Sequence, residues 1–190
     1  RQAGGYAHGT FKYLTWDKVE ELRDDPLIKE SGLRLYVGMP GKEPFNKAHV
    51  EVGYSDANIA KWMFVEPVEG RFPEEGSNEA ASDLRVLSLL GVEPVLGNEF
   101  TMTFDVDGVE TTETFTLCGW WEYDPAIVAS HVMLPQSRAD NILEALDAQS
   151  NDGMTGLWSL DVMVANSLHI ERDMDIVLSN HGYHGDRAQD

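Results

Sequence analysis

Apolar positions along the chain follow two spacings, and each spacing predicts one kind of element. Alternating apolar and polar residues are typical of a half-buried strand, whereas apolar residues three and four apart form one face of a helix. Helices are expected to begin after a Ser, Thr or Asp cap and to end at Gly or Pro. The expected helices are 16–23 after the cap Thr15, 57–62 after Ser55 or Asp56, 83–90 after Ser82 and before Gly91, one that begins at Ser137, and 170–178.

Strands are predicted between these helices, mostly from alternation. The strongest signal is Asp107-Gly108, which lies between two alternating runs and favours the tight turn of a β-hairpin. Residues 120–131 are expected to be a loop, and the Asn-, Asp- and Gly-rich residues 149–156 a linker. The expected strands are 33–38, 48–54, 78–81, 100–106, 109–117, an extended segment 131–134, and 157–165.

The order of these elements predicts an α+β fold with two lobes. The chain opens with a helix followed by a strand and closes with a strand followed by a helix, so both ends can build one layer. We expect a terminal α+β lobe from residues 10–45 and 155–184. The inserted lobe, residues 46–150, is expected to mix strands and helices and to contain the hairpin. Residues 1–9 are expected to be a flexible lead-in and residues 185–190 a tail.

The charge balance restricts the classes of partner. The 190 residues include 14 Lys and Arg against 33 Asp and Glu, which gives a net charge of −19. Such a charge repels nucleic acid and anionic lipid. It is typical of a highly soluble surface or, alternatively, of a surface that attracts cations or cationic peptides.

Neither a membrane helix nor a disulfide is predicted within the chain. The least charged stretch, residues 125–137, is shorter than the ~20 apolar residues that a membrane helix needs. The chain opens with Arg1 rather than Met and shows no signal peptide, which indicates a fragment or a processed product. Cys118 is the single cysteine, and its alternating neighbours favour a small strand residue over a reactive thiol.

Two short motifs resemble metal sites, and each has a simpler interpretation. His181 and His184 have a spacing that two ligands of one metal ion can have, but they follow a helix end near the end of the chain, which favours a tail. Asp105 and Asp107 resemble the start of a calcium loop, but the later ligands of such a loop are missing. A hairpin turn is therefore favoured at Asp107.

A group of carboxylates around Arg71 invites an acid–base interpretation. The loop is rich in Pro and Gly, with no apolar segment to raise a pKa, so a solvated loop with Arg71 in a salt bridge is favoured. The sequence also has no nucleophile elbow, dinucleotide fingerprint or phosphate loop. We therefore predict no catalytic residue, no cofactor, no metal and no enzymatic activity. The carboxylates are those of Glu66, Glu69, Glu74 and Glu75.

The tryptophans lie in different predicted elements, which favours a role in the core. Trp120 and Trp121 differ from the others because they are adjacent, and neighbouring residues of a strand point to opposite faces. One of the two side chains is therefore expected to be exposed. We predict Trp120 and Trp121 as candidate contacts with a partner or a lipid interface.

Residues 70–119 are rich in turns and caps and carry the main resemblance to a known family. Gly70-Arg71-Phe72-Pro73 is followed by Asn78-Glu79-Ala80, a helix to Leu90-Gly91, Leu96-Gly97, and strands that end at Thr116-Leu117-Cys118-Gly119. In this order the segments resemble the extracytoplasmic domain of MacB/FtsX-type ABC transporter permeases. Residues 9–15 and 26–29 resemble the Gram-positive members, and the resemblance covers residues 10–182.

The resemblance implies a two-lobed domain on the extracellular face of the cell membrane, held between two transmembrane helices that this chain lacks. It further implies that a separate cytoplasmic ATPase subunit moves those helices. The domain would couple that motion to an extracellular peptide, lipoprotein or protein partner, in export, lipoprotein release or peptide sensing.

Two alternatives stay open beside this interpretation. The acidic surface and the Trp120-Trp121 pair are not assigned by the family pattern, so the substrate class is open. One alternative is a stand-alone acidic extracellular module that binds cationic peptides or metal ions. The other, with less support, is a secreted hydrolase that uses the loop carboxylates.

Overall fold

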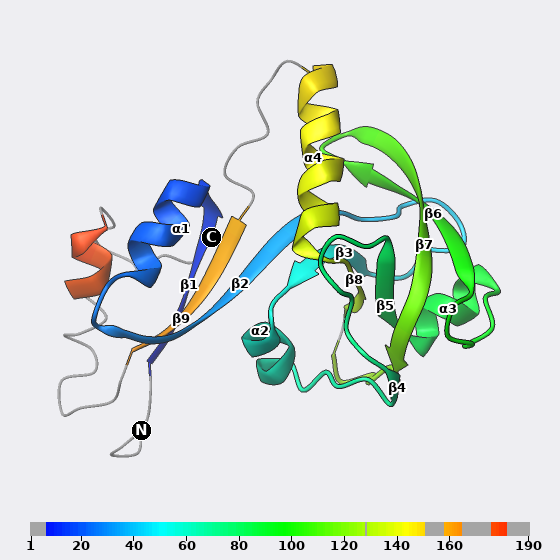
Figure 1. Cartoon of the computed structure of the whole chain (residues 1–190), viewed down its shortest axis with the longest axis horizontal. Coiled ribbons are helices and arrows are strands. Elements are labelled where there is room, and N and C mark those ends of the chain that lie inside the picture. The colour runs from blue at the N-terminus through cyan, green and yellow to red at the C-terminus, as the bar shows by residue number, and fades with distance from the viewer. Residues whose placement is uncertain (1–6, 128, 151–157, 165–175, 182–190) are drawn as a thin grey trace. The chain divides into compact units, whose positions relative to one another are not determined.

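A computed structural model describes residues 7–127, 129–150, 158–164 and 176–181, and the chain divides into two compact units (Figure 1). Unit 1 comprises residues 1–34, 56–59 and 155–190, and unit 2 comprises residues 35–55 and 60–154. The lobe boundaries given above from the sequence stay predictions. Within the described part of the chain, no helix combines the length and the apolar character needed to cross a membrane.

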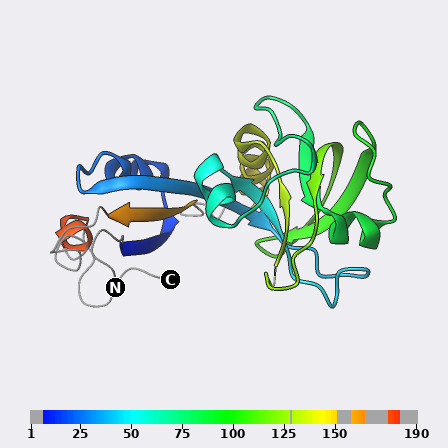
Figure 2. The ribbon, with the colours of Figure 1, turned by 90° about the horizontal axis from the view of Figure 1, so that it is seen from below.

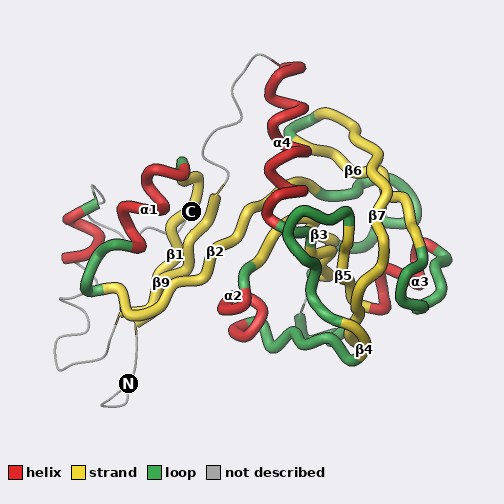
Figure 3. The backbone as a smooth tube through the Cα atoms, viewed as in Figure 1, coloured by secondary structure: helices red, strands yellow, loops and turns green. Residues whose placement is uncertain are grey.

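Unit 1 contains a sheet whose strands come from both ends of the chain (Figure 3). The strand order is β1-β9-β2, and β1 pairs antiparallel with β9 so that Phe11 lies opposite Leu160. Helix α1 buries Val19 and Leu22, and residues 176–180 are helical and bury Val177 and Leu178. The elements are β1 (Ala7–Leu14), α1 (Trp16–Arg23), the first part of β2 (Ile28–Gly38) and β9 (Trp158–Val164).

Strand β1 corrects the expectation of a flexible lead-in over residues 1–9. Residues 7–9 belong to β1, which the sequence pattern does not predict. The Thr10 hydroxyl donates to Oδ1 of Asp161 at 3.0 Å, so the strand is stabilised by a partner from the far end of the chain. A Gly-containing segment of weak intrinsic strand preference becomes a strand when such a partner supplies its hydrogen bonds.

Unit 2 is built around β7, which has neighbours on both sides. Strands β5 and β7 are parallel, as are β3 and β8, whereas β4 and β6 pair antiparallel with β7. The order is β2-β3-β8-β5-β7-β4, and α4 lies beside these strands (Figure 2). The further elements are β3 (Val50–Ser55), α2 (Ala57–Trp62), β4 (Glu69–Gly70), β5 (Glu79–Asp83), α3 (Leu84–Leu90), β6 (Glu99–Val106), β7 (Val109–Trp121), β8 (Ser130–Met133) and α4 (Gln136–Ser150).

The predicted helix caps are largely confirmed, with one correction. Thr15 accepts from the Lys18 N–H and Asp56 from the Ile59 N–H. The cap of α3 is Asp83, whose carboxylate accepts from the Val86 N–H at 3.1 Å, and not Ser82. Ser82 instead lies fully buried in β5, because that strand runs two residues past the predicted end at residue 81.

The predicted hairpin is confirmed. Asp107 and Gly108 have φ of 49° and 82°, the two positive values that a type I′ turn requires. Phe104 and Phe115 are buried on the inner face, and the Thr101 and Thr114 hydroxyls are hydrogen-bonded on the outer face at 2.9 Å. Strand β7 continues to Trp121, so the loop predicted to begin at residue 120 begins two residues later.

Other expectations fall partly or wholly outside the described residues. These are most of the lead-in, residues 151–156 of the predicted linker, residues 170–175 of the last helix, and the tail. The helix expected at Ser137 is present as α4, and its predicted apolar face is buried.

Candidate functional site

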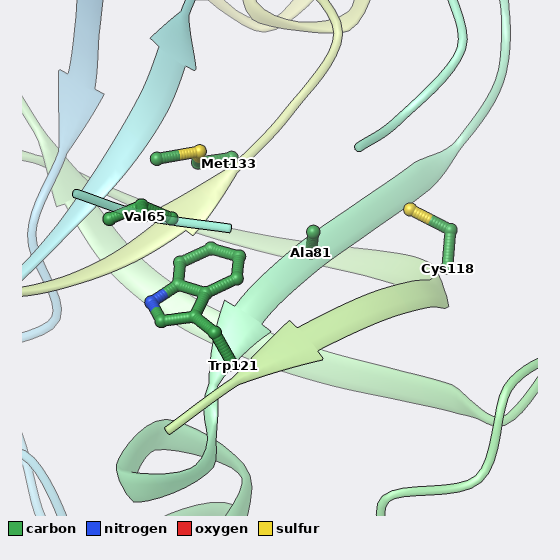
Figure 4. Packing of buried hydrophobic residues seen from close by; sticks show 5 residues of the cluster. All are labelled: Val65, Ala81, Cys118, Trp121 and Met133. Atoms are coloured by element: carbon green, nitrogen blue, oxygen red, sulfur yellow. The ribbon is translucent and has the colours of Figure 1, made fainter. Parts of the chain in front are cut away.

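The predicted contact pair lies at the end of β7, where the two tryptophans have different environments. Trp121 is 7% exposed and packs in a cluster with Val65, Ala81, Cys118 and Met133 (Figure 4). Trp120 is half-buried and lies opposite Glu69 of β4. The contact with a partner stays a prediction, and within the pair Trp120 is the residue whose side chain reaches the surface.

The segment between α2 and β5 covers Trp121. The Phe72 ring lies 6.1 Å from the Trp121 ring, centroid to centroid, and Met63 and Phe72 pack against the same cluster from partly buried positions. The Val68 N–H donates to the Trp120 carbonyl at 2.8 Å, and the Arg71 N–H to the Cys118 carbonyl at 2.9 Å. Both bonds hold the segment along the edge of β7.

Phe64 lies at a strained point of this segment. At the end of α2, the Val65 N–H donates to the Ala60 carbonyl and the Phe64 N–H to the Lys61 carbonyl, which is a Schellman arrangement. The position of Phe64 in this arrangement is left-handed and usually holds Gly. Phe64 has φ of 58°, and left-handed geometry costs a residue with a Cβ roughly 1–2 kcal/mol. Its side chain is 92% exposed, so no burial offsets this cost.

Arg71 forms a two-pronged ion pair with Glu79, a partner that the sequence pattern did not identify. Both guanidinium-to-carboxylate distances are 2.8 Å, and the Glu74 N–H donates to the same carboxylate at 3.0 Å. The Arg71 guanidinium lowers the pKa of Glu79 to about 2. The ion pair joins the residue that follows β4 to the first residue of β5.

The four predicted loop carboxylates do not form one acid–base site. The carboxylate of Glu75 accepts from the Gln136 and Ser137 N–H groups at 3.0 and 2.9 Å, where α4 begins. The positive end of the helix dipole favours a carboxylate at this position, so Glu75 has a structural role. Glu66, Glu69 and Glu74 are exposed.

Cys118 is a buried residue of β7, as predicted. Its thiol donates to the carbonyls of Arg71 and Ala80 at 3.3 and 3.4 Å. Burial, together with the negative charge of Glu79, raises the pKa of the Cys118 thiol to about 12. The thiol is therefore neutral near pH 7 and is a poor nucleophile.

His181 in unit 1 connects the helical residues 176–180 to α1. Its side chain is 6% exposed; Nδ1 contacts the Glu21 carboxylate, and Nε2 lies 2.9 Å from Oδ2 of Asp25. Each ring nitrogen thus has its own carboxylate partner. His184 lies outside the described residues. Within the described ranges, no group of three or more His, Cys, Asp or Glu side chains is arranged to hold a metal ion.

A hollow of about 550 Å³ lies beside the Arg71–Glu79 ion pair. Its wall includes Leu96, Thr116 and Leu117. Aliphatic and charged groups thus meet at one edge of unit 2. No comparable apolar feature was predicted from the sequence, because Leu96 and the ion pair come from segments that are separate along the chain.

Comparison with solved structures identifies the fold. No model of a known protein family matches the sequence, and none of the curated proteins matches it. The periplasmic region of MacB from Actinobacillus actinomycetemcomitans is similar with a TM-score of 0.55 and 15% identity, over 95% of this chain and 86% of that one. The extracellular domain of the noncanonic ABC-type transporter YknZ from Gram-positive bacteria has a TM-score of 0.53 and 11% identity, over 95% and 96%.

A third solved structure is similar over nearly the same range. A domain of a proposed permease protein from Porphyromonas gingivalis has a TM-score of 0.51 and 12% identity, over 93% of this chain and 79% of that one. Identities this low establish fold and not activity. The predicted α+β class is confirmed, and the chain has the fold of the extracytoplasmic domains of MacB-type ABC transporter permeases, as its sequence resemblance predicted.

Proposed function

We propose that this chain is the extracytoplasmic domain of an ABC transporter permease, displayed on the extracellular face of the cell membrane and without catalytic activity of its own. The observation that supports this most is the likeness of fold, over 95% of the chain, to the periplasmic region of MacB and the extracellular domain of YknZ. A likeness of fold supports a function only by analogy, so features of the chain's own structure are needed as further support for this proposal.

The position of the first and last described segments supports an inserted domain. Ala7 of β1 lies opposite Val164 of β9, and His181 contacts α1, so all three belong to unit 1. A domain held between two membrane helices must enter and leave through one part of its structure. Unit 1 suits that role, which leaves unit 2 to contact a substrate or partner.

The connections between the units suit the transmission of motion. The chain passes between the units at four points, and two of these lie within regular elements: within β2, between Arg34 and Leu35, and within α2, between Ile59 and Ala60. The other two lie between Ser55 and Asp56 and between residues 154 and 155. Regular secondary structure is stiffer than a loose linker. In the proposed mechanism, a separate cytoplasmic ATPase subunit moves the transmembrane helices, and unit 1 passes this motion to unit 2 through these elements.

The location is tested by labelling in whole cells. The natural full-length protein is produced in its host with Thr103→Cys, an exposed position on β6, in a Cys118→Ser background. A maleimide that does not cross the cytoplasmic membrane is expected to label the introduced thiol in intact cells. Labelling only after the membrane is opened would contradict the proposed location.

The coupling is tested separately, in the full-length permease reconstituted with its ATPase subunit. Spin labels at Thr103 in unit 2 and at Lys29 in unit 1, both exposed, report the distance between the units. The distance distribution is expected to change between the nucleotide-free and ATP-bound states. An unchanged distribution, together with normal labelling in whole cells, would reject the coupling while leaving the location intact.

A further inference from the structure

Exposed apolar side chains gather in two loops of unit 2. Seven large apolar side chains are exposed among the described residues, and four of them lie in the segments 64–68 and 95–96. We name these four the apolar edge. Its members are Phe64, Val68, Val95 and Leu96, which are 92%, 59%, 51% and 46% exposed.

Strand β7 holds the two loops against each other. The Val68 N–H donates to the Trp120 carbonyl, and the Gly97 N–H to the Leu117 carbonyl at 2.9 Å, so both loops follow the same margin of β7. Leu96 also packs against Gly70 of β4. The two residues are so close that a Cβ added to Gly70 would lie 2.8 Å from Cδ2 of Leu96. The hollow described above opens beside Leu96 and has room for one inserted side chain.

The backbone strain at Phe64 indicates that its exposed side chain has a function. A Gly at this position would satisfy the left-handed geometry of the helix end without strain. The chain instead carries a Phe that is almost fully exposed. Strain that nothing in the fold requires is more common where a side chain has a function.

The charges around the apolar edge select the kind of partner. Segments 61–80 and 92–99 contain seven glutamates and two cations, Lys61 and Arg71. Arg71 is already paired with Glu79, and Glu66, Glu69 and Glu93 are exposed around the apolar edge. This surface repels anionic lipid and attracts positive charge.

We propose that the apolar edge binds a segment of a partner protein in which an apolar anchor residue is flanked by Lys or Arg. The anchor enters the hollow beside Leu96, the exposed side chains of the apolar edge contact the rest of the segment, and the flanking cations meet the surrounding glutamates. Large anchors in a desolvated centre with a charged rim are the usual anatomy of a protein interface. The inference does not depend on the proposed function, because it concerns the chain by itself.

Binding is tested on the purified chain with synthetic peptides and fluorescence anisotropy. A fluorescent peptide of Leu and Lys is expected to bind, a peptide of Ser and Lys with the same charge to bind at least about tenfold more weakly, and a peptide of Leu and Glu not to bind. Equal binding of the two Lys peptides would reject an apolar contact. Stronger binding to neutral phospholipid vesicles than to the Leu and Lys peptide would also overturn the proposal.

Variants locate the binding on the surface. The pair Val68→Ser and Leu96→Ser is expected to weaken binding at least about tenfold, because anchor contacts dominate interfaces. Ile176→Ser, which removes a 38% exposed apolar side chain from unit 1, is the matched control and is expected to change nothing. An equal effect of both changes would place the binding elsewhere.

Phe64→Gly separates binding from folding. The change is expected to raise the urea midpoint of unit 2 and at the same time to weaken peptide binding at least about tenfold. Phe64→Leu, which keeps an apolar side chain, is expected to retain most of the binding. A Phe64→Gly variant that binds as tightly as the wild type would remove Phe64 from the proposal.

Discussion

The ion pair between Arg71 and Glu79 makes the sharpest prediction about stability. Glu79→Gln keeps the size of the side chain and removes its charge. In the folded chain the pKa of Glu79 is lowered from 4.5 to about 2, mainly by the Arg71 guanidinium. At about 1.4 kcal/mol per pKa unit, the full shift corresponds to roughly 3 kcal/mol. Because the Arg71 side chain is 49% exposed and water screens the pair, we expect a loss of about 1–2 kcal/mol.

The pH dependence of this loss identifies its cause. A carboxyl group whose pKa is lower in the folded than in the unfolded chain stabilises the fold above its unfolded pKa, and this contribution disappears as pH falls through the folded value. The difference between wild type and Glu79→Gln is therefore expected to be full at pH 7. It should shrink between pH 4.5 and about 2.

The measurement is urea denaturation at pH 7, 5 and 3, combined with hydrogen exchange of the β5 and β7 amides to follow unit 2. Glu74→Gln is the matched control. Its carboxylate is 71% exposed and lies 3.9 Å from Arg71, so its loss is expected to change stability by less than about 0.5 kcal/mol. An equal loss for Glu79→Gln at pH 7 and pH 3, or an equal loss for the control, would refute the ion pair as the cause.

Three further predictions concern other parts of the fold. Gly108→Ala is expected to lower the free energy of unfolding, measured in urea, by roughly 1–2 kcal/mol, because φ is 82° at this position. Gly41→Ala is the control: φ there is ordinary and the nearest atom to an added Cβ is 3.7 Å away, so the same assay should show almost no change. Cys118 is expected to resist an aromatic disulfide reagent at pH 8 until the chain is unfolded in urea; full modification of the folded protein within seconds would contradict its burial. His181→Ala leaves Asp25 buried without this partner and is expected to lower the free energy of unfolding by about 1–3 kcal/mol. The loss should be seen as faster hydrogen exchange in residues 176–181. Unchanged exchange there would show that the contact does not stabilise the helix.

The sequence predicts well those elements whose signal lies within a few residues. Thr15 caps α1, Gly91 ends α3 with φ of 70°, and Asp107-Gly108 turns the hairpin. Each of these depends on the geometry of a single turn, which a few neighbouring residues determine. The apolar face of α4, including Ile142 and Leu143, is likewise buried as its spacing predicts.

Elements with distant partners are predicted poorly. Strand β1 escapes prediction because its hydrogen bonds go to β9, and Thr10 bonds Asp161 across 151 positions of sequence. The cap of α3 is Asp83 rather than Ser82 because β5, held between β7 and β8, continues to Asp83. Local preference does not report such pairings, since they depend on strand order in the finished sheet.

The sequence by itself determined the tight turn of the hairpin, most of the helix caps, the apolar faces of the helices, the strong negative charge and, through the order of its motifs, the fold. Only the tertiary structure decided that Trp121 is buried while Trp120 reaches the surface, and that Glu79 is the partner of Arg71. It also brought the two loops of the apolar edge together on one margin of β7 and left their four apolar side chains, including Phe64, exposed. The physical reason is the same in each case. Whether a side chain is buried in the core, paired with an opposite charge or exposed depends on the segments that pack against it, and these lie far from it in the sequence.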